Sequence, residues 1–228
     1  MDFRDISKMR VTVRQFAPRP VEKEKTDLIL EAGRWSPTAV DYQPQRILVL
    51  NTDESLRKVR EFCTFGYDQK YVDIDKNCDA GDGEHTVFYY GAPLVFLVCW
   101  DKSACWIHPQ NGESSGSTDA TIVTTHMMLE AASLGLGTVW ISYFDQEKAR
   151  ALLNIPENYA INGMLYVGYP SKDFVPNPKL SGKRRPISET CFDNSYAIPY
   201  QTNFFEQAAT VEFESLPERV ASIERDIC

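Results

Sequence analysis

Two arginines flank a hydroxyl residue near the start of the chain, in the segment Arg10-Val11-Thr12-Val13-Arg14. Alternate side chains of an extended segment point to the same side, so Arg10, Thr12 and Arg14 could face one ligand. Two guanidinium groups and a hydroxyl are donors that suit a phosphate group. A solvated basic patch in front of a helix is the alternative that these residues leave open.

Three further segments carry groups that could meet a ligand. Residues 36–44 combine a hydroxyl, a carboxylate and amides in a turn-rich stretch, and residues 135–145 enter an apolar strand through two glycines. The edge of that strand could offer backbone N–H groups to a heterocycle. Residues 183–185 are a run of three cations after a proline-rich stretch. An ordinary turn, a core strand and a solvated face are the respective alternatives.

Other motifs give no site. The chain has no GxGxxG and no Walker loop. Its GxSxG at residues 112–116 lies far from the preceding strand, and the only later histidine lies in the next predicted helix, so we interpret it as a flexible loop. The three histidines and six cysteines share no metal-ligand spacing. We therefore expect no metal site.

The charge balance excludes some classes of partner. The 228 residues include 24 Lys and Arg against 32 Asp and Glu, a net charge of -8. An acidic chain is a poor ligand for nucleic acid or an anionic membrane surface. No apolar run reaches the about 20 residues that cross a bilayer, and the N-terminus lacks the apolar region of a signal peptide. A cytoplasmic protein without nucleic-acid or membrane partners is expected.

Apolar periodicity predicts the elements that must position these groups. The alternation of strands and helices indicates an α/β or α+β sheet with helices on its faces. The helix over 118–134 is small or apolar on nearly every side, so it should be a central helix or a subunit interface. Helices are expected at 2–9, 21–35, 53–62, 118–134 and 146–153, and strands at 46–51, 93–100, 138–144 and 163–168.

Two stretches lie outside this pattern. Residues 63–85 are polar and aperiodic, which is typical of an excursion that could serve as a lid. The chain after Pro186 is interpreted as an extension that ends in a capped amphipathic helix beginning at Ser215. A helix that short needs a surface to pack on.

Taken together and in order, these segments resemble the FMN-dependent nitroreductase family over residues 3 to 188. The matching pieces are RxTxRxF, EAGRWSPTAVDYQP before ILVL, LEAASLGLGTVWISYFD, and VGYPSKD with a later KRRP. The resemblance implies an α+β fold, with a mixed sheet flanked by helices, and an intertwined homodimer that holds FMN in its interface. It also implies an FMN-binding domain over 1–188 and a C-terminal extension over 189–228 that packs on the body or the partner subunit.

The resemblance assigns cofactor contacts residue by residue. No side chain is expected to be catalytic, since the chemistry takes place on the flavin. The phosphate and ribityl chain would be held by Arg10, Val11 (through its backbone), Thr12, Arg14, Lys183 and Arg184. The other subunit's flavin would be reached by Pro37, Thr38, Ala39, Asp41 and Gln43, and the isoalloxazine ring would lie over Trp140, Ile141, Ser142 and Tyr143.

The activity implied is hydride transfer from NADH or NADPH through flavin N5 to a small oxidised acceptor such as a nitroaromatic or a quinone. One alternative is a reductive dehalogenase that resembles iodotyrosine deiodinase, for which Tyr67, Lys70 and Tyr71 offer the residue types that hold an amino-acid zwitterion. Another is a flavin-binding carrier or sensor without turnover.

The sequence departs from the family pattern in three places. Asp41 stands where the family usually has Asn, which would place a carboxylate near the flavin and disfavour its anionic reduced form. Tyr143 replaces a common glycine and would narrow the cavity. The loop over 101–117 and the tail after Thr190 exceed a minimal member, so access of the substrate cannot be inherited from the resemblance.

Overall fold

The computed structural model describes residues 2–66, 85–176 and 184–201. The chain divides into two compact units, Met1–Phe174 and Val175–Cys228. Of the elements in the described residues, the first unit holds every strand and every helix except one. The second unit, where it is described, contains the short helix α8 (Ile187–Thr190) and a tight hairpin closed by the bridge between Phe192 and Pro199.

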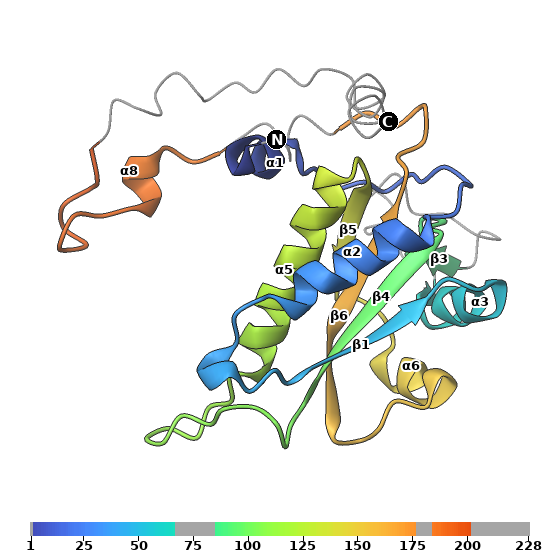
Figure 1. Cartoon of the computed structure of the whole chain (residues 1–228), viewed down its shortest axis with the longest axis horizontal. Coiled ribbons are helices and arrows are strands. Elements are labelled where there is room, and N and C mark those ends of the chain that lie inside the picture. The colour runs from blue at the N-terminus through green and yellow to red at the C-terminus, as the bar shows by residue number, and fades with distance from the viewer. Residues whose placement is uncertain (1, 67–84, 177–183, 202–228) are drawn as a thin grey trace. The chain divides into compact units, whose positions relative to one another are not determined.

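The first unit is built on a four-stranded sheet in the order β1-β4-β6-β5 (Figure 1). Neighbouring strands run antiparallel. The residue Thr12 adds an isolated parallel bridge to Thr138 of β5, so the parallel pairing of the expected mixed sheet is limited to this one bridge. The strands are β1 (Gln45–Leu50), β4 (Leu94–Asp101), β5 (Gly137–Ile141) and β6 (Tyr159–Gly168).

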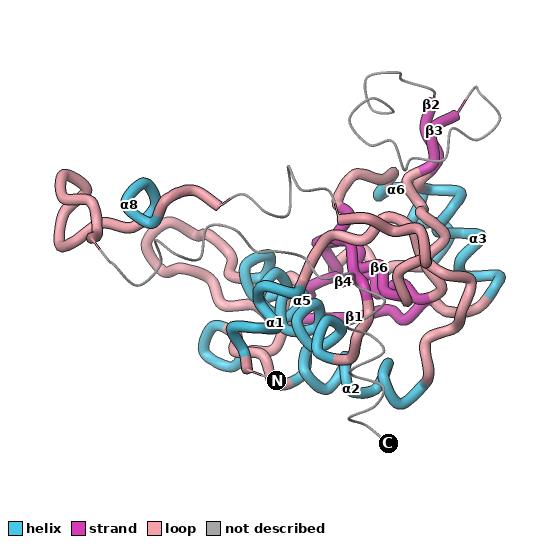
Figure 2. Tube along the Cα trace, turned by 90° about the horizontal axis from the view of Figure 1, so that it is seen from above, coloured by secondary structure: helices cyan, strands magenta, loops and turns pink. Residues whose placement is uncertain are grey.

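Helices cover both faces of this sheet (Figure 2). On one face α2 (Lys23–Arg34) crosses α5 (Gly116–Ser133), and α1 (Phe3–Met9) contacts α5. On the other face lie α3 (Asp53–Phe62) and α6 (Gln146–Leu153). A side chain at Gly33 would come within 2.9 Å of Met127 Cγ, so this glycine lets α2 and α5 approach closely. The α+β class with flanking helices is confirmed.

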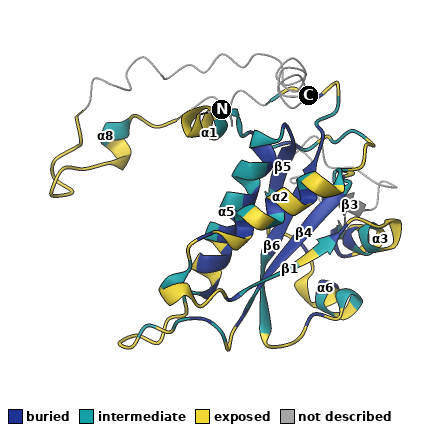
Figure 3. Ribbon diagram, viewed as in Figure 1, coloured by how far each residue is buried: buried dark blue, intermediate teal, exposed yellow. Residues whose placement is uncertain are grey.

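Two apolar clusters form the core, one on each face of the sheet. Figure 3 shows the central strands buried and the outer sides of the helices exposed. The inner side of α5 is fully buried at Ala120, Val123 and Met127, whereas Ile122 and Leu129 on its other sides are only half-buried. The predicted burial on several sides is therefore partial within one subunit.

Most predicted elements are confirmed with shifted ends, and two stretches need correction. The excursion predicted to be aperiodic over 63–85 begins and ends in paired strands, β2 (Thr64–Gly66) and β3 (His85–Val87). The loop over 101–117 contains a hydrogen-bonded hairpin, with a bridge between Ile107 and Ser114. Short-range pairing of this kind leaves little periodicity to recognise. The predicted helix from Ser215 lies outside the described residues.

Among the residues that the structure describes, no helix has both the length and the apolar character to span a bilayer.

Candidate functional site

The segment over residues 10–17, here called the strap, crosses the end of the sheet where β5 begins and β6 ends. The Val13 N–H donates to the Thr138 carbonyl at 2.9 Å, and the Ala17 N–H donates to the Tyr169 carbonyl at 2.8 Å. In return the Ser171 N–H donates to the Gln15 carbonyl at 2.9 Å. The strap is thus held by backbone bonds on both strands.

Glycines make room for the strap. A Cβ at Gly137 would lie 2.5 Å from Val13 Cγ2, and a Cβ at Gly168 would lie 2.9 Å from Phe16 Cδ1. Both distances are shorter than real Cβ contacts, so a side chain at either position would force its neighbours to shift; at Gly168 the nearest atom is Pro93 Cδ, at 2.6 Å. The glycine-punctuated entry into β5 that the sequence shows therefore serves packing of the strap.

The strap alternates as an extended segment should. Val11 and Val13 are buried, while Arg10, Thr12 and Arg14 are half-buried on the other side. This alternation in burial is what an extended segment with these three side chains on one side would show. Their role as phosphate ligands stays a prediction.

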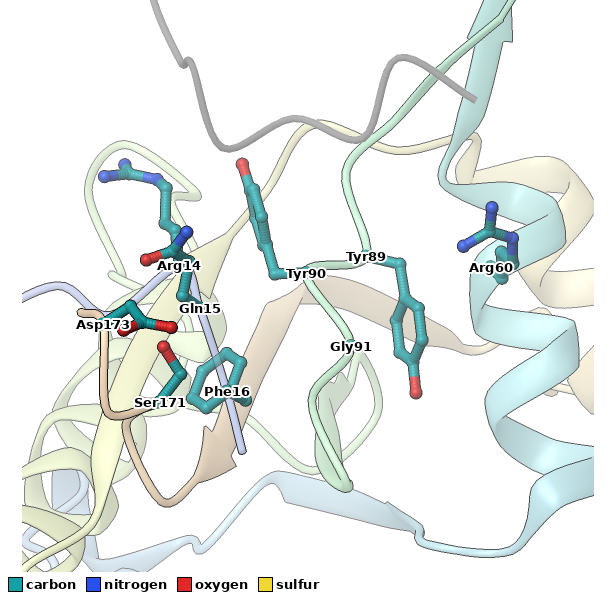
Figure 4. A pocket seen from close by; sticks show the side chains of 9 residues that line it. All are labelled: Arg14, Gln15, Phe16, Arg60, Tyr89, Tyr90, Gly91, Ser171 and Asp173. Atoms are coloured by element: carbon teal, nitrogen blue, oxygen red, sulfur yellow. The ribbon is translucent and has the colours of Figure 1, made fainter. Parts of the chain in front are cut away.

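A cavity of about 420 Å³ opens beside the strap, within the range of small-ligand pockets. Figure 4 shows Arg14 and Arg60 on opposite sides of the Tyr90 ring. The lining comes from the strap, from the end of α3, and from the turns that precede β4 and follow β6: Arg14, Gln15, Phe16, Arg60, Tyr89, Tyr90, Gly91, Ser171 and Asp173.

The donor set of this cavity suits a planar anion. Two guanidinium groups and the Ser171 hydroxyl can donate hydrogen bonds, and Asp173 is the acidic residue that lines it. Tyr90 presents an aromatic ring, which can stack on a flat ligand. Two arginines therefore line one cavity in a chain whose net charge is -8. An aromatic compound that carries a phosphate fits this chemistry.

A buried polar chain supports the turn that carries Tyr90. The Tyr166 hydroxyl donates to the Phe88 carbonyl at 3.2 Å and lies 3.1 Å from Cys63 Sγ. Tyr166 and Cys63 are fully buried. Burial raises the pKa of the Cys63 thiol to about 12, so the thiol stays neutral and is not a nucleophile.

Sequence reasoning missed the turn over residues 88–91. Tyr90 and Gly91 both have a positive φ, at 55° and 70°, which is unusual for a residue as large as tyrosine. The Tyr-Tyr-Gly-Ala-Pro run before β4 was the available signal, since Gly and Pro mark such turns.

The second predicted segment forms a turn at the N-terminal end of α5. Three residues of this turn, defined as residues 38–43, have a positive φ: Val40, Asp41 and Gln43. The Gln43 N–H donates to Thr38 Oγ1 at 3.1 Å, which closes the turn. The Ala39 N–H donates to Asp119 Oδ1 at 2.9 Å, which ties the turn to the first turn of α5.

The turn and the strap lie at opposite ends of α5. The strap pairs with Thr138, just past the C-terminal end of the helix. The 18 residues of α5 rise about 1.5 Å each, so its ends are about 27 Å apart. Within one subunit the two predicted sets of cofactor contacts, including Pro37 in front of the turn, do not come together.

The third predicted segment, residues 140–143, lies at the end of β5 and just beyond it. The Trp140 indole packs over Gly163, where a Cβ would lie 2.5 Å from Nε1. Ile141 is buried and ends the strand, so Ser142 and Tyr143 lie beyond it and are exposed. The Tyr143 ring meets the Phe88 ring edge-on, with centroids 5.5 Å apart.

The remaining predicted residues are not placed at the cavity. Arg184 belongs to the second unit, so its part in a phosphate site stays a prediction. Lys183 lies outside the described residues, as do Tyr67, Lys70 and Tyr71 of the alternative zwitterion site. In ranges 2–66, 85–176 and 184–201, no group of three or more His, Cys, Asp or Glu side chains is arranged to hold a metal ion.

Comparison with known proteins identifies the family and the fold. Residues 8–169 match the sequence model described as the Nitroreductase family. A protein of Methanothermobacter thermautotrophicus, provisionally named NADH dehydrogenase/NAD(P)H nitroreductase, is 28% identical over 182 residues, which cover 76% of this chain and 80% of that one. The crystal structure of a nitroreductase family protein from Clostridium difficile 630 superposes with a TM-score of 0.69 at 32% identity, covering 86% and 99% of the two chains.

A structure of oxidised iodotyrosine deiodinase bound to FMN and 3-iodo-L-tyrosine also shares the fold. Its TM-score is 0.60 at 22% identity, and the match covers 78% of this chain and 94% of that one.

Proposed function

Because the chain belongs to the nitroreductase family, we propose that it is an FMN-dependent oxidoreductase that passes hydride from NADH or NADPH to a small oxidised acceptor, such as a nitroaromatic or a quinone. FMN would supply the hydride-carrying ring, and the protein supplies binding, orientation and exclusion of water. The observation that supports the proposal is the cavity beside the strap, which Arg14 and Arg60 line at opposite ends, with the rings of Tyr90 and Tyr89 between them.

The strap would hold the phosphate end of the cofactor. Arg10, Thr12 and Arg14 share one side of an extended backbone that glycines and hydrogen bonds fix in place. A phosphate dianion binds best where several cations and donors converge in partly buried surroundings. Lys183 and Arg184 would add cations from the late part of the chain, and residues 140–143 at the end of β5 would lie along the flavin ring.

The site would be completed by a second copy of the chain. The turn over 38–43 and the strap lie at opposite ends of α5, a helix about 27 Å long, so we infer that the two reach one cofactor only when they come from different subunits. Ile122 and Leu129 on α5 are apolar and half-buried, a surface that a second copy would cover. We therefore propose a homodimer with two such sites.

Titration of the purified protein with FMN tests the cofactor. The flavin fluorescence should be quenched on binding, and NADH or NADPH should bleach the bound flavin under anaerobic conditions. Arg14→Glu should weaken FMN binding by about a hundredfold or more, because it replaces a charge-assisted hydrogen bond by repulsion. Lys102→Glu, at the far end of β4, makes the same charge change away from the cavity and is the matched control. FMN affinity that is equal in both variants would contradict the phosphate site.

Mixed dimers test the two-subunit site. A chain with Arg14→Glu is co-expressed with a chain in which Thr38→Ala and Gln43→Ala disrupt the turn, and the mixed dimer is isolated through two different tags. If the strap and the turn come from different subunits, one intact site remains and the dimer binds one FMN. If both come from the same subunit, no intact site remains. Zero FMN per mixed dimer refutes the proposed assembly.

A second candidate activity is reductive dehalogenation of a halotyrosine. The likeness in fold to iodotyrosine deiodinase favours it, at a TM-score of 0.60. Release of iodide from 3-iodo-L-tyrosine by the reduced protein, faster than reduction of a quinone, would favour this activity over the first. A flavin that is reduced but is reoxidised by neither acceptor would indicate a carrier or sensor.

A further inference from the structure

One buried carboxylate joins two loops at the N-terminal end of α5. Asp119 is 2% exposed. Its Oδ1 accepts the Ala39 N–H of the turn at 2.9 Å, and its Oδ2 accepts the Ser115 hydroxyl at 2.7 Å. The Ser115 N–H in turn donates to the Trp106 carbonyl at 2.9 Å. Asp119 therefore fastens the turn and the chain segment around Trp106 to the same point of the fold.

That segment is a hairpin, defined here as residues 105–115. Ile107 pairs with Ser114, and the His108 N–H donates to the Glu113 carbonyl at 2.8 Å. Gly112, with a φ of 73°, allows the tight reversal at its tip. The hairpin is thus an ordered part of the fold, and it lies with the turn at the lower end of α5 in Figure 1.

Both loops present large apolar side chains to the outside. Val40 and Tyr42 of the turn are 66% and 53% exposed, and Ile107 of the hairpin is 49% exposed. The Trp106 and His108 rings meet edge-on, with centroids 5.4 Å apart. The turn and the hairpin thus both offer exposed apolar side chains on loops that share the anchor Asp119.

We propose that Asp119 is a positioning residue, and that the hairpin it fastens to the turn forms an apolar wall of the acceptor cavity over the partner subunit's flavin. The proposal rests on the proposed function, which places the turn at that flavin. The hairpin shares the anchor of the turn, so it reaches the same place. The occupant of the cavity is a flat aromatic acceptor, which buries one face on the flavin and the other against Ile107 and Trp106.

The hairpin wall should make the enzyme prefer acceptors with a larger aromatic ring system. A bicyclic quinone covers more of Ile107 than a monocyclic quinone does, and each gain in buried apolar area strengthens binding. The ratio of kcat/KM for 1,4-naphthoquinone to that for 1,4-benzoquinone is therefore the readout. Both values are measured on the same enzyme preparation, so the ratio does not depend on the fraction of protein that is active.

The decisive variants are Ile107→Ser and Ser115→Ala. The first removes the apolar surface. The second removes the bond from the Ser115 hydroxyl to the Asp119 carboxylate and keeps the Ala39 bond of the turn and the backbone bond from Asp119 to Ser115. Each should lower the naphthoquinone to benzoquinone ratio about fivefold, with the Kd for FMN unchanged within about twofold. Leu48→Ser removes an exposed apolar side chain on the opposite face of the sheet and should leave the ratio unchanged.

Asp119→Asn weakens the anchor of both loops, so it should lower the ratio and also raise the Kd for FMN. If Asp119→Asn does not fold, Ser115→Ala still decides. Wild-type protein that fails to bind FMN would refute the proposed function itself. Normal FMN binding and turnover together with an unchanged quinone ratio in Ile107→Ser and Ser115→Ala would overturn the assignment of Asp119 and the hairpin alone.

Discussion

Replacing Gly137 by alanine should displace the strap. The new Cβ would lie 2.5 Å from Val13 Cγ2 and 2.8 Å from Val13 Cβ, and Val13 is fully buried, so it has nowhere to move. Overpacking of this kind costs about 1–3 kcal/mol, and loss of the Val13 to Thr138 hydrogen bond costs about 1 kcal/mol. Alanine recovers about 0.5–1 kcal/mol over glycine in a strand. The net loss of unfolding free energy should be about 1–3.5 kcal/mol, with a central value of about 2 kcal/mol.

A double-mutant cycle isolates the contact. Val13→Ala alone should cost about 2 kcal/mol, through loss of buried methyl groups. In the double variant the contacts to Val13 Cγ1 and Cγ2 vanish and only the 2.8 Å contact to Cβ remains, so rescue should be partial. With the central value for Gly137→Ala, simple addition gives about 4 kcal/mol, whereas we expect about 3 kcal/mol for the double variant.

Urea denaturation measures these free energies, and quenching of FMN fluorescence measures the site. In Gly137→Ala the Kd for FMN should rise at least about tenfold, because the strap carries the arginines that would hold the phosphate. Wild-type stability in Gly137→Ala, or effects that simply add in the double variant, would refute the close packing of the strap on β5. Lower stability with unchanged FMN affinity would show that the strap does not contribute to FMN binding.

Three other substitutions test separate parts of the structure. Burial raises the pKa of Glu22, but hydrogen bonds outweigh it and lower the pKa from 4.5 to about 2. Above about pH 4.5, Glu22→Gln should therefore reduce the free energy of unfolding by about 1 kcal/mol after allowance for solvent screening. Denaturation curves should show this loss disappear as the pH falls towards 2. Tyr166→Phe leaves the Phe88 carbonyl without that donor and should cost about 1–3 kcal/mol by the same method, although an isosteric ring remains. Asp41→Asn should raise the midpoint potential of the bound flavin by about 30 mV, which spectroelectrochemistry measures, since a carboxylate near the ring opposes its anionic reduced form. A potential that is unchanged would place Asp41 away from the flavin.

Much of the fold follows from local pattern. The continuous apolar run of β4 is recognisable because burial on both faces of the sheet removes polar residues from it. The helix α5 is recognisable from its long run of small and apolar residues. The short strands β2 and β3 and the hairpin at 105–115 were missed, because three-residue strands and tight turns depend on pairing more than on periodicity. The turn that places Tyr90 in the cavity was missed for the same reason.

By itself the sequence determined the chemistry of the strap: alternation in residues 10–14 puts valines on one side and the two arginines and a threonine on the other, because successive side chains of an extended backbone point in opposite directions. Only the tertiary structure decided where these groups lie. Gly137 and Gly168 admit the strap to the sheet end, Arg60 comes to the same cavity from a separate helix, and the length of α5 keeps the turn at the far end of the subunit. Such distances depend on the packing of elements that are remote in sequence, and no local pattern encodes them.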